Sequence, residues 1–315
     1  LVTEKIHIHD ETLRDGRQVI IPPEEALQGA KKLEALERYY SCLSRLGVCL
    51  VDVGVPIAGG YDHWLAQRFS ELCTNDRNMC LNGFTTANLT AIDKTVEALS
   101  GANQMGVSIL TSSSSAHMGK FRQKLEEKAL RGNNQNITDG EFKAELNKMR
   151  DMTEKDFEKA VEHAGDLLRA GVINRVHVYL EDATRMDKGE ELKRLINSAH
   201  KYKEAGATDI SFPDTMGLFL PEQQLDFHAA LYEACPFLGK ETKTTAHTHN
   251  DFGRGLDNAL ALLNNRYAQI VEGTFGGNGP GEGVGNADLN TVIYNLLQYA
   301  EAYPGKFPEL AYKDL

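Results

Sequence analysis

Residues 243–251 read Lys243-Thr244-Thr245-Ala246-His247-Thr248-His249-Asn250-Asp251, an extended stretch that ends in polar residues. The pattern is typical of a β-strand, in which residues i and i+2 point to the same face. His247 and His249 therefore share a face, and both imidazoles could bind one divalent metal. The alternative is a pair of unrelated polar residues at a strand end. The rest of the chain decides between the two.

Strand-like runs recur along the chain, and helix-like segments separate most of them. We expect eight strands, at residues 6–12, 49–54, 79–84, 104–111, 175–181, 209–213, 244–249 and 268–273. Helical spacing of apolar residues marks segments that include 24–46, 156–170, 190–205 and 287–303. Eight strand-then-helix units are typical of an α/β fold, the (β/α)8 TIM barrel. We therefore predict a single catalytic barrel domain over residues 1–315.

The interval between the fourth and fifth strands is much longer than the others. It contains the polar stretch Arg131-Gly132-Asn133-Asn134-Gln135-Asn136. Segments that follow a barrel strand lie on the catalytic face, so we expect an insertion there at about residues 118–153. We interpret it as an extended helix plus a lid or a partner-contacting loop. The alternative for its asparagine-rich tip is a solvated loop without a role.

Composition and charge limit the class of protein. The chain has 41% hydrophobic and 25% charged residues, as ordinary globular proteins do. No apolar run approaches the ~20 residues of a membrane span, and the first residues lack the layout of a signal peptide. The five cysteines form no Cys-X-X-Cys pair, which favours reduced thiols in a cytoplasmic protein. The net charge of −11 argues against nucleic acid or an anionic membrane as a partner.

Functional side chains of a barrel gather where its strands end. The first strand ends in Glu11-Thr12-Leu13-Arg14-Asp15-Gly16-Arg17-Gln18. Asp15 is a candidate third metal ligand, and Arg14 is a fixed cation that could polarise a carbonyl oxygen. Taken alone, such a turn is more often structural. His7 and His9 form a second His-X-His pair, but they come early in the strand. We expect them towards the bottom of the barrel, without a ligand role.

Five blocks of sequence resemble the DRE-TIM metallolyase family and run in the family's order. They are residues 12–16, 178–183, 212–217, 247–251 and the glycine-rich segment 271–286. The family includes 2-isopropylmalate, homocitrate and citramalate synthases, hydroxymethylglutaryl-CoA lyase and 4-hydroxy-2-oxovalerate aldolase. The resemblance implies a TIM barrel, metal-dependent chemistry on a 2-oxo acid, and a homodimer.

The resemblance also implies a metal site. Asp15, His247, His249 and Asn286 would bind a divalent metal, and Mn, Zn, Mg and Co all suit two imidazoles, a carboxylate and an amide oxygen. Arg14 would bind the substrate and, together with the metal, stabilise the alkoxide that forms at the carbonyl carbon.

Further residues of the family motifs would bind the substrate. Tyr179 and Glu181 would line the oxo-acid pocket, with Glu181 taking part in catalysis. Thr215 would hydrogen-bond the substrate carboxylate, although a helix cap or turn is the alternative role. His117 would lie near the substrate, the alternative being a surface histidine. Asp52 would support Arg14 by charge pairing.

The chain departs from the condensing members of the family at two places. Arg17 stands where they have a glutamate, and we expect this change to alter substrate recognition. The loop after the eighth strand is longer at residues 276–281 and lacks their arginine. It also lacks the cysteine of hydroxymethylglutaryl-CoA lyase, which disfavours that chemistry.

These features favour a metal-dependent acyltransferase that condenses acetyl-CoA with a 2-oxo acid to give a 2-hydroxy dicarboxylic acid. The alternative is a metal-dependent carbon–carbon lyase that works by a retro-aldol or retro-Claisen reaction. A third possibility is a metal-free barrel whose glycine-rich loop binds phosphate. The expected partners are a small 2-oxo acid and an acyl-CoA. We predict that Asn82, Thr85 and Thr86 contact the side chain of the oxo acid.

Overall fold

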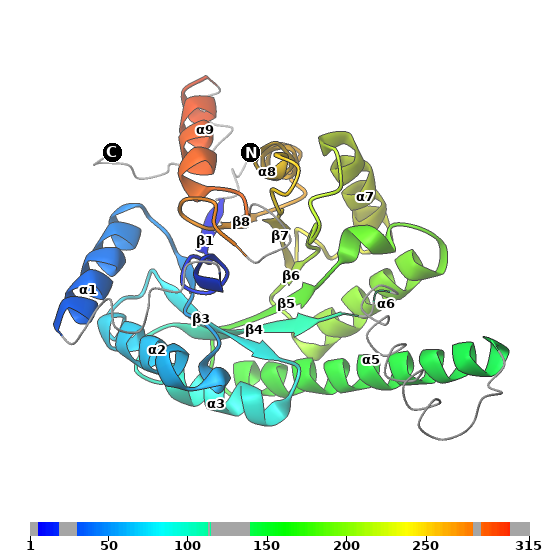
Figure 1. The fold of residues 1–315 in the computed structure, drawn as a ribbon, viewed down its shortest axis with the longest axis horizontal. Helices are drawn as coiled ribbons and strands as arrows, with labels where there is room; N and C mark the ends of the chain where they lie inside the picture. Colours follow the sequence, from blue (N-terminus) through cyan, green and yellow to red (C-terminus); the bar gives the residue numbers. More distant parts are fainter. Residues whose placement is uncertain (1–5, 19–29, 113, 115–138, 280–284, 303–315) are drawn as a thin grey trace.

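The computed structural model describes residues 6–18, 30–112, 114, 139–279 and 285–302. Within these residues, eight parallel strands form a closed barrel in sequential order, and β8 pairs with β1 (Figure 1). The predicted (β/α)8 fold is therefore confirmed. The strands are β1 (His7–Asp10), β2 (Leu50–Asp52), β3 (Cys80–Thr86), β4 (Met105–Thr111), β5 (Arg175–Leu180), β6 (Asp209–Ser211), β7 (Lys243–His247) and β8 (Ile270–Gly273).

Helices surround the barrel and cover its outer face (Figure 1). They are α1 (Ala30–Arg45), α2 (Gly60–Leu72), α3 (Leu89–Leu99), α5 (Asp139–Arg169), α6 (Gly189–Ala205), α7 (Pro221–Ala234), α8 (Gly255–Asn264) and α9 (Leu289–Ala302). Short 3₁₀ turns occur at η1 (Gly16–Gln18), η2 (Pro56–Ala58) and η3 (Ala183–Met186). Local sequence sets the ends of these helices. The Asn88 side chain accepts a hydrogen bond from Ala91 N (3.1 Å) and begins α3, whereas Gly206 ends α6 with a left-handed φ of 117°.

The apolar core lies between the strands and the helices. Outward-facing strand residues such as Val51, Leu81, Val107 and Val178 are fully buried against the helix ring. The residues between them along each strand point into the barrel, because successive side chains of a strand face opposite sides.

All the strands except β3 are shorter than predicted, and the helix predicted over residues 156–170 begins earlier, at Asp139. β2 and β6 span three residues each. Beyond β2 the chain still follows β3 for one residue, because Val53 N donates to Asn82 O at 2.9 Å. The extended helix predicted within residues 118–153 corresponds to the start of α5, which projects past the barrel in Figure 1. Residues 118–138 of that insertion lie outside the described residues.

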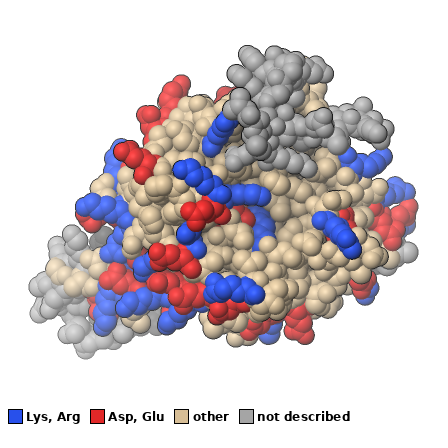
Figure 2. Space-filling model, turned by 180° about the vertical axis from the view of Figure 1, so that it is seen from behind, with Lys and Arg blue, Asp and Glu red and all other residues tan. Residues whose placement is uncertain are grey.

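The hydropathy of the helices and the charge of the surface show whether a membrane or a nucleic acid could be a partner. None of the described helices is both long and apolar enough to cross a membrane. On the face turned away from the reader in Figure 1, Lys and Arg side chains lie among Asp and Glu side chains (Figure 2). The described part of that face therefore presents no continuous basic stripe of the kind that binds nucleic acid.

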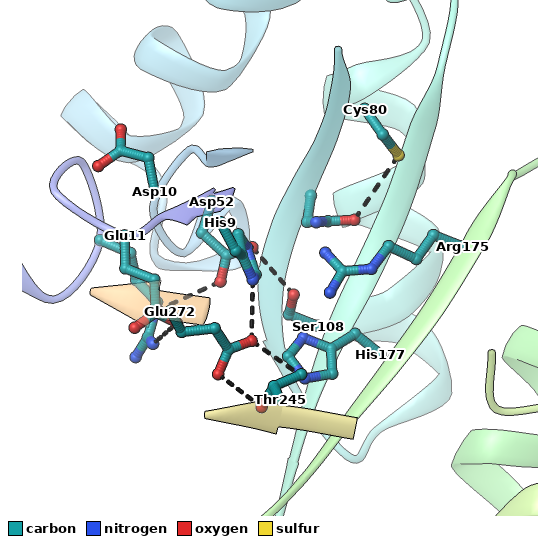
Figure 3. A network of polar contacts seen from close by, with 12 residues as sticks. His9, Asp10, Glu11, Asp52, Cys80, Ser108, Arg175, His177, Thr245 and Glu272 are labelled. Atoms are coloured by element: carbon teal, nitrogen blue, oxygen red, sulfur yellow. Dashed lines mark hydrogen bonds and ion pairs between the residues drawn. The ribbon is translucent and has the colours of Figure 1, made fainter. Parts of the chain in front are cut away.

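The barrel interior is unusually polar. Branched apolar residues usually fill the interior of such barrels in layers. Here the inward-facing positions include several fully buried polar side chains that contact one another (Figure 3). They are His9, Asp52, Asn82, Ser108, His177, Ser211, Thr245 and Glu272. Unpaired polar groups are costly to bury. We therefore expect these side chains to be paired with one another and to support the site above them.

Candidate metal centre and substrate cavity

The His-X-His pair lies at the carboxyl end of β7, as predicted. His247 is the last residue of the strand, and both imidazoles are buried. Their Nε2 atoms are 3.3 Å apart. Burial and the neighbouring His247 lower the pKa of His249 to about 3, so His249 is neutral at pH 7. Burial lowers the pKa of His247 as well, but the nearby carboxylates of Glu11 and Glu272 outweigh burial and raise the pKa to about 10.

Asp15 and Asn286 reach the same place from distant parts of the sequence. Donor atoms of Asp15, His247 and His249 all lie within 4.8 Å of one another. Asn286 forms an isolated β-bridge with His249 and donates from Nδ2 to Asp15 Oδ2 at 2.9 Å. A neighbouring backbone bond, from Asn250 N to Gly285 O (2.7 Å), holds this segment against the end of β7. The four predicted ligands therefore form one cluster.

The donor set fits a divalent metal. Two ligands at about 2.1 Å from an ion, at angles of 90–110°, lie roughly 3.0–3.4 Å apart, and the Nε2 atoms of His247 and His249 have this spacing. The side-chain oxygen of Asn286 is buried without a hydrogen-bond partner among the described residues. Since buried polar atoms are normally paired, a cation beside Asn286 Oδ1 would explain it.

Arg14 is buried beside this cluster. Its guanidinium forms ion pairs with Glu11 and Asp15, and its Nε lies 3.4 Å from Asp52 Oδ2, so the predicted pairing with Asp52 is present. The carbon at the centre of the guanidinium is 4.4 Å from the centre of the Phe84 ring. Burial lowers the pKa of Arg14, but Asp15 and Glu11 outweigh this effect and hold the pKa well above its usual value. Arg14 is thus a permanent, fixed cation.

Glu11 was missed as a site residue in the sequence analysis. It is fully buried, and its Oε1 accepts a hydrogen bond from the Tyr179 hydroxyl at 2.5 Å as well as one from Arg14. The arrangement places the carboxylate between two predicted substrate-binding residues. A signal was available in the sequence, because an acidic residue two positions beyond His9 continues the inward-facing side of β1.

A cavity of about 260 Å³ opens beside the metal cluster. Of the residues predicted to bind substrate, Arg14, Tyr179, Glu181 and Thr215 line it. The Thr215 hydroxyl oxygen accepts a hydrogen bond from Asp182 N at 2.9 Å, which leaves its hydrogen to be donated towards a substrate carboxylate. The remaining wall is largely apolar and consists of Phe84, Leu110 and Pro213.

The structure differs from the predicted pocket wall at β3. Asn82 is fully buried inside the barrel, below the cavity, and neither Thr85 nor Thr86 lines the cavity. Phe84 lines it instead, because it shares the inward face with Asn82 and lies one step nearer the mouth. Arg17 forms an ion pair with Asp62 of α2 and lies outside the cavity wall. His117 lies outside the described residues.

A larger hollow of about 580 Å³ lies at the opposite end of the barrel. Residues that precede or begin the strands line it, among them His7, Cys49 and Lys243. Barrel enzymes carry their chemistry at the carboxyl ends of the strands, and the cluster of Asp15, His247 and His249 lies at that end. We therefore assign the candidate site to the smaller cavity.

Fold and donor set together define a (β/α)8 barrel with a candidate metal site at the carboxyl ends of its strands. The chain belongs to the HMGL-like family, which it matches over residues 5–304. The resemblance to the DRE-TIM metallolyases is thereby confirmed.

Relatives and solved structures agree with this assignment. The chain is 32% identical to the 2-isopropylmalate synthase of Heliobacterium modesticaldum over 94% of its own length and 48% of that protein. It is 28% identical to the 2-isopropylmalate synthase of Pelotomaculum thermopropionicum, over 96% and 50% of the two chains. The chain thus spans about half the length of the curated relatives it matches. The HMG-CoA lyase of Bacillus subtilis has the same fold, with a TM-score of 0.66 at 18% identity and coverage of 98% and 89%.

Proposed function

We propose that the protein is a metal-dependent acyltransferase that condenses acetyl-CoA with a 2-oxo acid to a 2-hydroxy dicarboxylic acid. The observation that carries the proposal is the convergence of Asp15, His247, His249 and Asn286 beside Arg14, at the mouth of a small cavity. The names of the curated relatives support the condensing reaction. A homodimer, implied by the family resemblance, stays a prediction.

Each cavity residue has a task in this reaction. A divalent metal (Mn, Zn, Mg or Co) bound by the four ligands would supply a Lewis acid for the oxo acid. Arg14 places positive charge where the former carbonyl oxygen becomes an alkoxide. Thr215 donates to the substrate carboxylate. We assign to Glu181, which lies in the cavity wall, the removal of a methyl proton from acetyl-CoA; the enolate carbon then bonds to the oxo carbon, whose oxygen takes up a proton, and water cleaves the thioester to release free CoA.

The decisive assay mixes the protein, Mn²⁺, acetyl-CoA and a panel of 2-oxo acids and follows the release of free thiol. We expect thiol release that depends on both the oxo acid and the acetyl-CoA, with a 2-hydroxy diacid as product. Cleavage of 4-hydroxy-2-oxo acids or of 3-hydroxyacyl thioesters, without condensation, would instead establish the carbon–carbon lyase.

Removal of the metal is expected to abolish thiol release. The ligands are neutral or anionic oxygen and nitrogen donors without a thiolate, so EDTA should strip the ion and added Mn²⁺ should restore activity. The control is the far-ultraviolet circular dichroism of the stripped protein, which should keep its barrel signature. Full activity in EDTA would favour the metal-free phosphate-binding barrel.

The apolar wall predicts an oxo acid with an uncharged aliphatic side chain. Leu110 projects from β4 into the cavity beside Phe84 and Pro213. Leu110→Ala should therefore shift the ratio of kcat/KM towards oxo acids with longer side chains by about 10-fold or more. Ile109→Val is the matched control, because Ile109 is buried in the outer core and faces away from the cavity. Equal shifts in both variants would show that Leu110 does not contact the substrate.

A further inference from the structure

Glu272 occupies the centre of the polar interior, directly below the metal cluster. It is fully buried on β8, and the strand registers place it opposite His247 of β7 on one side and His9 of β1 on the other. Figure 3 shows its carboxylate between His9 and His177, with Thr245 below it. A carboxylate in an otherwise apolar strand needs strong compensation, and its neighbours supply it.

Both oxygens of Glu272 are held. Oε1 lies 2.8 Å from His9 Nδ1 and 3.3 Å from His177 Nε2. Oε2 accepts hydrogen bonds from Thr245 Oγ1 at 3.0 Å and from Ser211 Oγ at 3.3 Å. Burial raises the pKa of this carboxyl group, but the surrounding imidazoles outweigh burial, so the pKa lies well below its usual value and Glu272 is ionised. Its position is therefore fixed by hydrogen bonds from three other strands, β1, β6 and β7.

Glu272 has two further contacts: its Oε1 accepts a hydrogen bond from the Tyr179 hydroxyl at 3.4 Å, and its Oε2 faces His247, one of the proposed metal ligands. His247 Nδ1 lies 3.2 Å from Glu272 Oε2 and also 3.2 Å from Glu11 Oε2. The two contacts have the same length but differ in the angle at the His247 N–H group. Only the Glu272 contact has the alignment of a hydrogen bond, whereas Glu11 Oε2 has no hydrogen-bond partner among the described residues. Glu11 directs its other oxygen to Arg14 and Tyr179.

We propose that Glu272 is the positioning residue for His247. By accepting the proton on Nδ1, it fixes the ring orientation and leaves the Nε2 lone pair for the metal, the arrangement by which carboxylates behind histidine ligands raise metal affinity. His9, on the neighbouring strand β1, anchors Glu272 through the 2.8 Å contact with Oε1, and His177 of β5 lies 3.3 Å from the same oxygen without the geometry of a hydrogen bond. His9 thus supports the metal site through Glu272 without contacting the metal. This inference rests on the proposed metal site.

The test compares metal affinity among variants, with activity left aside. Glu272→Gln is expected to bind Mn²⁺ about 10- to 100-fold more weakly than the wild type, measured by competition with a chromophoric chelator. Glu272→Asp, which keeps the charge but shortens the side chain by one methylene, should lose affinity in the same direction. Glu11→Gln should have a smaller effect on metal affinity and a larger one on kcat, because Glu11 holds Arg14.

Controls separate a positioning role from general destabilisation. Ser108→Ala removes a hydrogen bond to Asp52 in the same buried network and leaves Glu272 in place, so its metal affinity should equal that of the wild type. In the wild type loaded with diamagnetic Zn²⁺, the His247 Nδ1 proton should give a downfield nuclear magnetic resonance signal that moves or disappears in Glu272→Asp.

Two failures are distinguishable. Wild-type affinity in a folded Glu272 variant, or absence of the Nδ1 proton signal in the wild type, would overturn the positioning role and leave the condensing function intact. Absence of metal binding by the wild type would contradict the metal site, and with it the proposed function.

Discussion

The His249→Ala variant is expected to bind Mn²⁺ at least about 100-fold more weakly than the wild type, because partners behind a ligand already contribute 10- to 100-fold. It should also lose thiol release in the condensation assay. His249 is one of the two proposed imidazole donors, and its Nε2 is 3.3 Å from that of His247. Removing it leaves Asp15, His247 and the amide oxygen of Asn286, a weak donor, so the ion should be held much less tightly. Metal content after gel filtration and a chelator-competition titration measure the effect.

A matched control is available on the surface. His163 of α5 is partly exposed and pairs with Asp93 of α3, far from the cavity wall. His163→Ala removes an imidazole without touching the site, so its metal affinity and activity should match the wild type. Tight metal binding by His249→Ala would place the ion elsewhere and contradict the four-ligand cluster.

The Arg14→Lys variant is expected to lose about 10²- to 10³-fold in kcat, the usual effect of removing one preorganised donor to a developing oxyanion. Metal affinity should fall much less. Arg14 holds Glu11 and Asp15 at once through a planar fork, and it packs 4.4 Å from the centre of the Phe84 ring. A lysine keeps the charge but cannot form both contacts in that geometry. Arg14→Ala is less useful, since it leaves buried carboxylates without a counter-charge.

The comparison variant is Arg17→Lys. Arg17 lies three residues away, pairs with Asp62 and packs 4.7 Å from the centre of the Tyr61 ring, outside the cavity wall. Its kcat should stay close to that of the wild type. If Arg14→Lys folds, binds the metal and keeps the wild-type kcat, Arg14 does not stabilise the transition state. A fall in both variants to the same level would point to loss of local structure.

Much of the site could be predicted, because the order of strands and helices along the chain determines which residues meet at the mouth of the barrel. Eight strand-then-helix units allow only a few topologies, and a barrel gathers the residues that follow each strand at one mouth. His247 and His249, two residues apart at the end of β7, must then face Asp15 after β1 across the closing strand β8. Asn286 follows β8 and reaches the same cluster, as its bridge to His249 shows.

The errors in the prediction concern side chains whose neighbours lie on other strands. Sequence spacing gives the face of a strand on which a residue lies, but not its height relative to the next strand. Asn82 was therefore expected in the cavity wall, whereas the register puts it inside the barrel and puts Phe84 at the mouth. The expectation that Arg17 alters substrate recognition stays a prediction; the structure pairs Arg17 with Asp62 of α2, outside the cavity wall.

The sequence by itself determined the barrel and named the four candidate metal donors that the structure brings together, because strand periodicity and motif order are local properties of the chain. The tertiary structure alone decided what Glu11 and Glu272 contact. Both are acidic residues next to strand ends, and both could have been solvated. The closure of β8 between β7 and β1 buries Glu272 against His247 and His9, and the fold of the first loop directs Glu11 to Arg14. Burial makes these contacts strong, and burial depends on the whole barrel.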